Sequence, residues 1–127
     1  SMLRELMAGI VLAFLAAGCS RPEPPVLPRV ARSILITDAR SGAKGELPLS
    51  EWNPVLRALG DCRWESGWFS VFEPELTIEV QGSPGRTVRV HLAGSEVNGG
   101  VEHGYSRCRL SEARANELRR ACLRALR

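Results

Sequence analysis

Two runs of alternating apolar and polar residues, separated by a Gly/Pro turn, constrain this chain more than any other feature. Residues 76–81 and 87–92 each place Leu, Ile or Val at every second position, and the turn GSPG lies between them at 82–85. A period of two is typical of a strand with one buried face, and two such runs around a turn predict an antiparallel hairpin. The chain is therefore expected to build a sheet whose apolar face is covered by a second layer.

The apolar positions also determine the register of this hairpin, because a slip of one residue would turn every side chain to the opposite face. With a loop over residues 82–86, the predicted register pairs apolar positions with each other: Val80 with Val88, Ile78 with Val90 and Leu76 with Leu92. The same register sets Glu79 opposite Arg89 on the outer face. A cross-strand ion pair there contributes roughly a few tenths of a kcal/mol.

Two further segments have the period of an amphipathic helix. In the first, the apolar residues Trp52, Val55, Leu56 and Leu59 fall at i, i+3, i+4 and i+7. The second follows Ser111, which suits the N-cap position. Its predicted buried stripe consists of Ala115, Leu118, Cys122, Ala125 and Leu126. Each helix therefore offers one apolar face to a sheet.

Short extended segments complete the predicted sheet. Residues 33–37 are rich in β-branched side chains and residues 63–72 in aromatic ones, so both are predicted as strands. A turn at residues 98–100 is expected to return the chain beside the hairpin, with Cys108 facing Val90. The resulting order, β-α-β-β-β-β-α, predicts an α+β fold: a two-layer antiparallel β-meander of about four to five strands with two helices on one face.

The N-terminal segment has the features of a targeting signal rather than of a folded domain. Ser1 precedes the first methionine and is interpreted as an addition to the natural chain. The run from Met7 to Gly18 is uniformly apolar or small, and Arg4 is the one basic residue before it. A membrane-spanning helix needs about 20 apolar residues, so this run is too short for one. It fits the hydrophobic region of a secretory signal peptide over residues 1–18.

The residues Ala16-Ala17-Gly18-Cys19 resemble the lipobox of bacterial lipoproteins. The resemblance implies that Cys19 becomes the acylated N-terminus, and that Ser20 directs sorting to the outer membrane with the domain facing the periplasm. An ordinary signal peptide with a chance cysteine is the alternative. Four prolines within residues 19–30 predict an extended stalk between the lipid and a single α+β domain of residues 31–127.

Three cysteines remain for this domain, and an exported chain is expected to oxidise two of them. Cys122 lies about three turns into the last helix, which must run back along the sheet. At about 1.5 Å per residue it is roughly 16 Å from the helix start, too far to bridge to Cys108. We predict the disulfide Cys62–Cys108, with Cys122 as a buried free thiol; Cys62–Cys122 is the alternative. The chain lacks paired Cys/His spacings, so we predict no metal site, and we predict no cofactor.

The positive charge of the chain lies mostly in its C-terminal third, where residues 86–127 contain nine arginines and four acidic residues. The predicted register gathers a candidate binding face from basic residues: Arg86, Arg89, His91, Arg107 and Arg109. Glu79 is the only acidic residue expected to lie next to them and offset their positive charge. Such a face suits an acidic protein or an anionic envelope component, whereas the export signal argues against nucleic acid. A solvated surface without a partner is the alternative.

Two further groups of residues are candidate sites. Trp64 and Trp68 form a candidate aromatic patch, either an interface hot spot or part of the core. The residues with catalytic chemistry are His91, His103, Asp38, Asp61, Ser106 and Cys62. They form no motif such as GxSxG or HExxH, so we predict that the protein is not an enzyme.

Together these features predict a lipid-anchored binding or structural module of the cell envelope, of unknown partner. An inhibitor or immunity-type lipoprotein is the alternative within the binding proteins. A small envelope enzyme is the alternative of another class.

Overall fold

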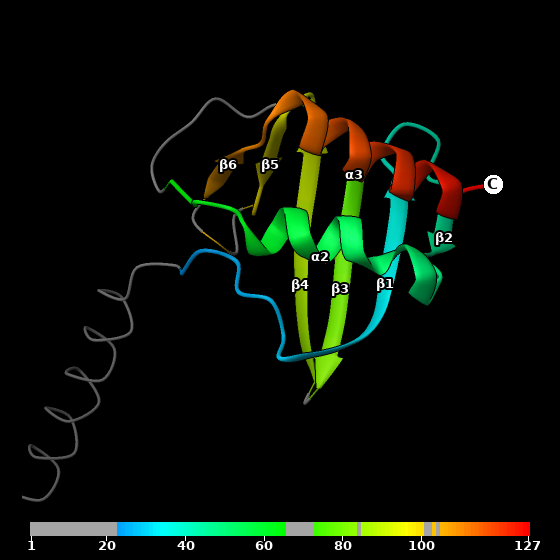
Figure 1. Ribbon diagram of the computed structural model, residues 1–127, viewed down its shortest axis with the longest axis horizontal. Helices are drawn as coiled ribbons and strands as arrows, with labels where there is room; N and C mark the ends of the chain where they lie inside the picture. Colours follow the sequence, from blue (N-terminus) through cyan, green and yellow to red (C-terminus); the bar gives the residue numbers. More distant parts are fainter. Residues whose placement is uncertain (1–22, 66–72, 84, 101–102, 104) are drawn as a thin grey trace, which may run out of the picture.

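The computed structural model of the 127-residue chain describes residues 23–65, 73–83, 85–100, 103 and 105–127. The strands are β1 (Val30–Asp38), β2 (Lys44–Glu46), β3 (Leu76–Ser83), β4 (Arg86–Ala93), β5 (Glu96–Asn98) and β6 (Arg107–Arg109). The helices are the short 3-10 turn η1 (Leu49–Glu51), α2 (Trp52–Gly60) and α3 (Glu112–Ala125). The strands form one antiparallel sheet in the order β2-β1-β3-β4-β5-β6, and α2 and α3 lie on one face of it (Figure 1). This is the two-layer α+β fold that the sequence predicts.

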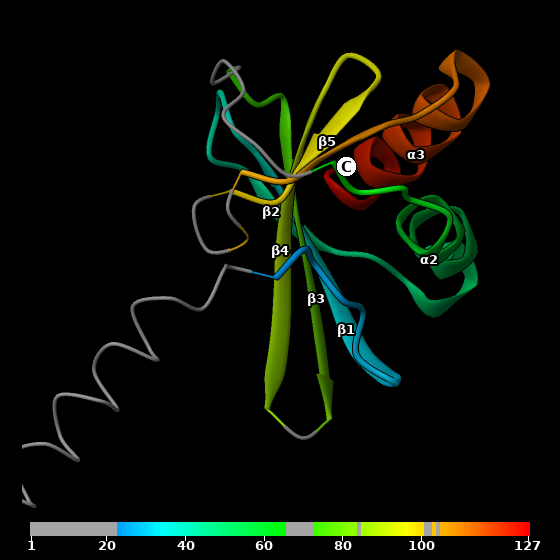
Figure 2. The same cartoon turned by 90° about the vertical axis from the view of Figure 1, so that its left-hand side faces the viewer.

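The core lies between the sheet and the two helices, which Figure 2 shows on one side of the strands. The sheet contributes alternate apolar residues with no exposed surface, among them Ile34, Ile36, Ile78, Val80, Val90 and Leu92. Val55 of α2 and Leu118 of α3 face them and are also fully buried. The alternation along β1, β3 and β4 therefore sorts side chains into an inner face toward the helices and an outer face away from them.

The predicted register of the β3–β4 hairpin is confirmed. Leu76 pairs with Leu92, Ile78 with Val90, and Val80 with Val88. Glu79 lies opposite Arg89, whose Nε donates a hydrogen bond of 2.9 Å to Glu79 Oε1. The Ser111 cap is confirmed as well, since its hydroxyl accepts from the backbone N–H of Arg114 at 3.1 Å.

Two strands of three residues each were not predicted. The chain turns at Gly94-Ser95 and forms β5, which inserts between β4 and β6. Cys108 therefore faces Val97, and its predicted pairing with Val90 was wrong. At the other edge β2 pairs with β1, and Gly45 sits so close to the backbone carbonyl of Ala125 in α3 that a side chain would not fit.

The predicted strand over residues 63–72 can be compared with the structure only at residues 63–65. Glu65 forms an isolated antiparallel bridge with Arg107, so the chain extends the sheet by one residue pair at the β6 edge. Both backbone groups of Arg107 bond to Glu65, at 2.8 and 3.0 Å. Residues 66–72 lie outside the described residues, and so does Trp68.

The proline-rich segment belongs to the domain from Pro25 onward, which corrects the predicted stalk over residues 19–30. Pro25 and Pro28 are buried, and Leu27 packs against the core. Pro28 lies directly over Gly82 of β3, where a side chain would collide with the proline ring. Proline content does not distinguish a free stalk from a segment that packs on its own domain.

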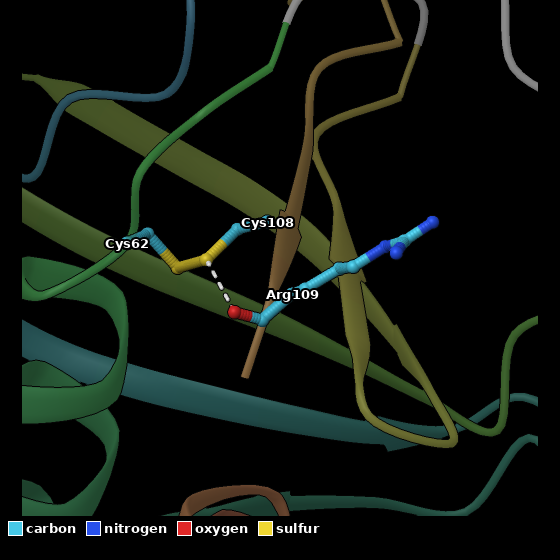
Figure 3. Close-up of a disulfide and its surroundings, with 3 residues drawn as sticks. All are labelled: Cys62, Cys108 and Arg109. Carbon is cyan, nitrogen blue, oxygen red and sulfur yellow. Dashed lines mark hydrogen bonds between the residues drawn. A yellow bond between two sulfur atoms is a disulfide. The ribbon is translucent and has the colours of Figure 1, made fainter. Parts of the chain in front are cut away.

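The predicted disulfide Cys62–Cys108 is present, with the two Cα atoms 5.5 Å apart. It joins the segment after α2 to β6, and Figure 3 shows the Arg109 side chain pointing away from the bridge. Cys122 is the free, buried thiol, as predicted. Its burial raises the pKa of the thiol from 9.0 to about 12, because an apolar environment disfavours the thiolate.

Candidate functional site

The outer face of the sheet carries polar side chains that lie in rows across the strands. One row crosses all six strands in register: Lys44, Thr37, Thr77, His91, Asn98 and Arg107. A second row crosses four strands: Glu46, Leu35, Glu79 and Arg89. Neither α2 nor α3 covers this face (Figure 2). It is therefore a surface on which the strands hold polar groups at fixed spacings.

Between β2 and β4 the outer face is hollowed. The hollow has a volume of about 480 Å³ and is wide open to solvent. Its lining includes Leu35, Thr37, Lys44, Glu46, Glu79 and Arg89. Leu35 is half-buried and lies between two carboxylates, since its cross-strand partners are Glu46 and Glu79. The hollow thus combines one apolar side chain with hydroxyls and charges of both signs.

Three arginines of the predicted basic face, Arg89, Arg107 and Arg109, share this outer face with more carboxylates than expected. Arg89 pairs with Glu79, as the sequence predicts. Arg107 Nη1 and Arg109 Nε lie 3.6 and 3.4 Å from Glu96 Oε1 on the neighbouring strand β5. The expectation that only Glu79 offsets the arginines was wrong.

Glu65 adds a further carboxylate, with its Oε2 3.6 Å from Arg107 Nε. Arg86 is exposed at the end of the β3–β4 hairpin, but it is in phase with the buried Val88 and Val90 and so belongs to the opposite face of the sheet. Its predicted place on the basic face was wrong. The outer face is therefore mixed in charge rather than basic. Sequence reasoning missed Glu96 because it missed β5, which brings that carboxylate between the arginines.

Of the residues with catalytic chemistry, His91 is placed beside a hydroxyl group. Its Nδ1 lies 3.0 Å from Thr77 Oγ1 across the β3–β4 pair, in the long polar row. His103 Nδ1 instead bonds to the backbone carbonyl of Glu23 at 3.0 Å. Ser106 is buried, and its hydroxyl donates to the carbonyl of His103. These polar groups hold the loop after β5 and the N-terminal segment in place.

The remaining three catalytic candidates also have local structural roles. Asp38 Oδ1 accepts from the backbone N–H of Arg40 at 2.9 Å and shapes the turn after β1. Asp61 pairs with Arg114 of α3 at 3.1 Å, and Cys62 is in the disulfide. Within the part of the chain that the structure describes, the six candidates do not converge into a nucleophile, a base and an orienting group.

Of the candidate aromatic patch, Trp64 belongs to the described residues and Trp68 does not. Trp64 is half-buried and packs at the margin of the core, where it lines a small gap with Pro25 and Leu27. Its side chain therefore covers the core rather than forming an exposed hot spot. For residues 23–65, 73–83, 85–100, 103 and 105–127, no group of three or more His, Cys, Asp or Glu could hold a metal ion. No helix among those residues is both long and apolar enough to span a bilayer.

A second, smaller hollow of about 190 Å³ lies where α3 meets the ends of β1 and β3. Its central residue, Arg119, bonds to Glu75 Oε2 at 3.1 Å and to the carbonyl of Gly94 at 2.6 Å. These bonds tie the helix to the chain on either side of β3 and β4. We assign this hollow a structural role.

Comparison with known proteins found no matching family model, and no match among the curated proteins or the solved structures. The assignment of a function therefore depends on the residues themselves.

Proposed function

We propose that this chain is a lipid-anchored binding module of the cell envelope. In this proposal, acylated Cys19 holds it in the outer membrane, and the domain faces the periplasm. The hollow on the outer face recognises a partner protein. The observation that supports recognition is the open polar face itself: rows of side chains on rigid strands around a hollow of about 480 Å³.

The anchor is supported by the lipobox-like sequence that ends at Cys19. The disulfide Cys62–Cys108 is consistent with it, because disulfides persist in oxidising compartments such as the periplasm.

The charge pattern favours a partner of mixed polarity over a strongly acidic one. An acidic protein or an anionic envelope component would have to compete with Glu79 and Glu96 for the arginines. By contrast, a protein segment with both polar and apolar groups could bond to the hydroxyls and charges while covering Leu35. A toxin or hydrolase inhibited by this protein would be one partner of that kind.

The anchor is tested with a fatty-acid probe in cells that produce the full chain. The parent is expected to incorporate the probe, whereas Cys19→Ser is expected not to, because the serine hydroxyl does not replace the thiol in this processing. Equal labelling of both chains would contradict the anchor.

The recognition surface is tested by incorporating a photocrosslinking amino acid at Thr37, in the hollow. The matched control position is Ala113, which is exposed on α3. Irradiation of intact cells is expected to give one discrete adduct from position 37 and none from position 113. Identical adducts from both positions, or none from position 37, would contradict a binding role for the hollow.

A further inference from the structure

We infer that the anchored domain is oriented with the β6 edge of its sheet, together with His103 and Tyr105, against the bilayer surface, and with the hollow directed away from it. This orientation rests on the proposed acylation of Cys19. The partner of the β6 edge is the lipid headgroup layer in which the anchor is inserted.

The chain that leads to the anchor packs on the domain from Glu23 onward. Glu23 is held through its carbonyl by His103, which lies in the loop between β5 and β6. Pro25 is buried against the same loop. A side chain on Gly99 would place its Cβ 2.7 Å from Pro25 Cγ and 2.9 Å from His103 Cβ. The absence of a side chain at Gly99 therefore provides the space that the proline occupies.

Only a short length of chain is left as a tether between the anchor and the domain. Between the anchoring Cys19 and the seated Glu23 there are four peptide units. A fully extended chain spans at most about 3.3–3.6 Å per residue, so Glu23 lies within about 14 Å of the lipidated residue, and His103 is bonded to Glu23. Because the headgroup layer is itself roughly 5–7 Å thick on each side, the tether leaves little room between this loop and the membrane.

The strand order separates the anchored end of the sheet from the hollow. β6 and β2 form opposite edges of the sheet. The seated segment approaches on the β5–β6 side, while β2 and the end of α3 lie on the other (Figure 1). Five strand spacings of about 4.8 Å separate the two edges, a distance of roughly 24 Å. An anchor near β6 therefore raises β2, and with it the hollow between β2 and β4, away from the lipid.

The side chains at this end suit a headgroup layer. His103 and Tyr105 are half-buried in the loop, and Arg63 is exposed next to the chain that borders β6. Aromatic side chains with a polar tip favour the membrane–water interface, and arginine binds phosphate. Tyr105 has a φ of +54°, the left-handed region that favours glycine, and its backbone N–H donates to the carbonyl of Gly100 at 2.8 Å.

The orientation is tested on the acylated full-length protein in lipid nanodiscs that contain an acceptor-labelled lipid. An azide-bearing amino acid carries the donor dye at Arg109 in one sample and at Lys44 in the other. Both positions are exposed and lie on edge strands of the same sheet, so they are matched except for their distance from the anchor. Energy transfer is expected to be strong from position 109 and weak from position 44.

Two variants test the cause of this difference. An insert of about 12 Gly/Ser residues between Pro22 and Glu23 adds roughly 20 Å of flexible tether, so transfer from position 109 should fall. Gly99→Ala should displace Pro25. The displacement also lengthens the free tether, so the energy transfer from position 109 should become more similar to that from position 44. Circular dichroism establishes that Gly99→Ala is folded, and the insert supplies the same test if that variant fails to fold.

The possible results distinguish a wrong orientation from a wrong assignment of the anchor. Equal transfer from both positions in a protein that carries the fatty-acid label overturns the orientation and leaves the anchor intact. Loss of transfer together with loss of the label overturns the anchor, and the orientation with it. Stronger transfer from position 44 would mean that the β2 edge faces the membrane.

Discussion

The two faces of the sheet differ in every property that matters for function, although they are built from alternate residues of the same strands. Ile36 points to the helices and has no exposed surface, whereas its neighbour Leu35 lines the open hollow. Inner positions hold apolar side chains in a dry core. Outer positions hold hydroxyls and ion pairs in contact with water. The comparison teaches that folding stability is concentrated on the inner face, so the proposed recognition role of the outer face does not conflict with folding.

The energies of the two faces follow from their environments. Complete burial of a Val, Leu or Ile side chain contributes about 1.5–3 kcal/mol, and the inner face buries many of them. An exposed ion pair contributes about 0–1 kcal/mol. Substitutions on the inner face are therefore expected to cost several times more than substitutions on the outer face.

The largest effect is expected from a charge placed on the inner face. Ile36→Lys puts an unpaired ammonium group among Ile34, Ile78 and the helices, where a buried charge costs several kcal/mol. We expect the isolated domain not to fold, as judged by circular dichroism. A stable folded variant would show that this position is not in the core.

Removal of the disulfide is the next largest expected effect. Cys62 and Cys108 are 46 residues apart, and a bridge over a loop of that length stabilises by about 2–4 kcal/mol, mainly by restricting the unfolded chain. The double variant Cys62→Ser, Cys108→Ser should lose this amount in urea denaturation. Cys122→Ser is the control for the loss of a cysteine that is not bridged. An unchanged midpoint in the double variant would contradict the assigned bridge.

The buried thiol of Cys122 should make the inner face sensitive to alkaline pH. Its pKa is raised to about 12 by burial, against 9.0 when exposed, so the folded state holds the proton more tightly than the unfolded state. The resulting stability is complete below pH 9 and is lost as the pH rises from about 9 toward about 12. Between pH 9 and about pH 10 the parent should lose about 1 kcal/mol more than Cys122→Ala. Parallel pH profiles would contradict the burial of the thiol.

The smallest effect is expected from the ion pair on the outer face. A double-mutant cycle over Glu79→Gln and Arg89→Gln should give a coupling free energy of about 0.2–1 kcal/mol, since Arg89 is half exposed. The coupling should decrease as salt is added. A coupling above about 2 kcal/mol would mean that the outer face contributes to folding in the same way as the inner face.

The parts of the fold that could be predicted from sequence are those with a repeating pattern. Alternation in β3 and β4 was long enough to give the register, and the spacing of apolar residues in α2 and α3 gave both helices. The strands β2 and β5 have only three residues each, too few to show a period. The turn at Gly94-Ser95, which separates β4 from β5, therefore could not be predicted.

The candidate site was predictable only where it depends on that register. Placing Arg89 and His91 on the outer face followed from the alternation of β4. The carboxylate of Glu96 and the hollow did not follow, because both depend on the short strands at the edges of the sheet. The packing of Pro25 could not be predicted either, because it depends on the space that Gly99 leaves in a distant part of the chain.

The most direct test of the division between the faces compares Leu35→Lys with the parent protein. The new lysine would lie between Glu46 and Glu79, so the variant should keep its stability to within about 1 kcal/mol. Because the same change removes the apolar centre of the hollow, the photocrosslinked adduct from position 37 should disappear. Retained stability with a lost adduct is the result that the account predicts. A variant that unfolds as Ile36→Lys is expected to, or one that is stable and still gives the adduct, would contradict it.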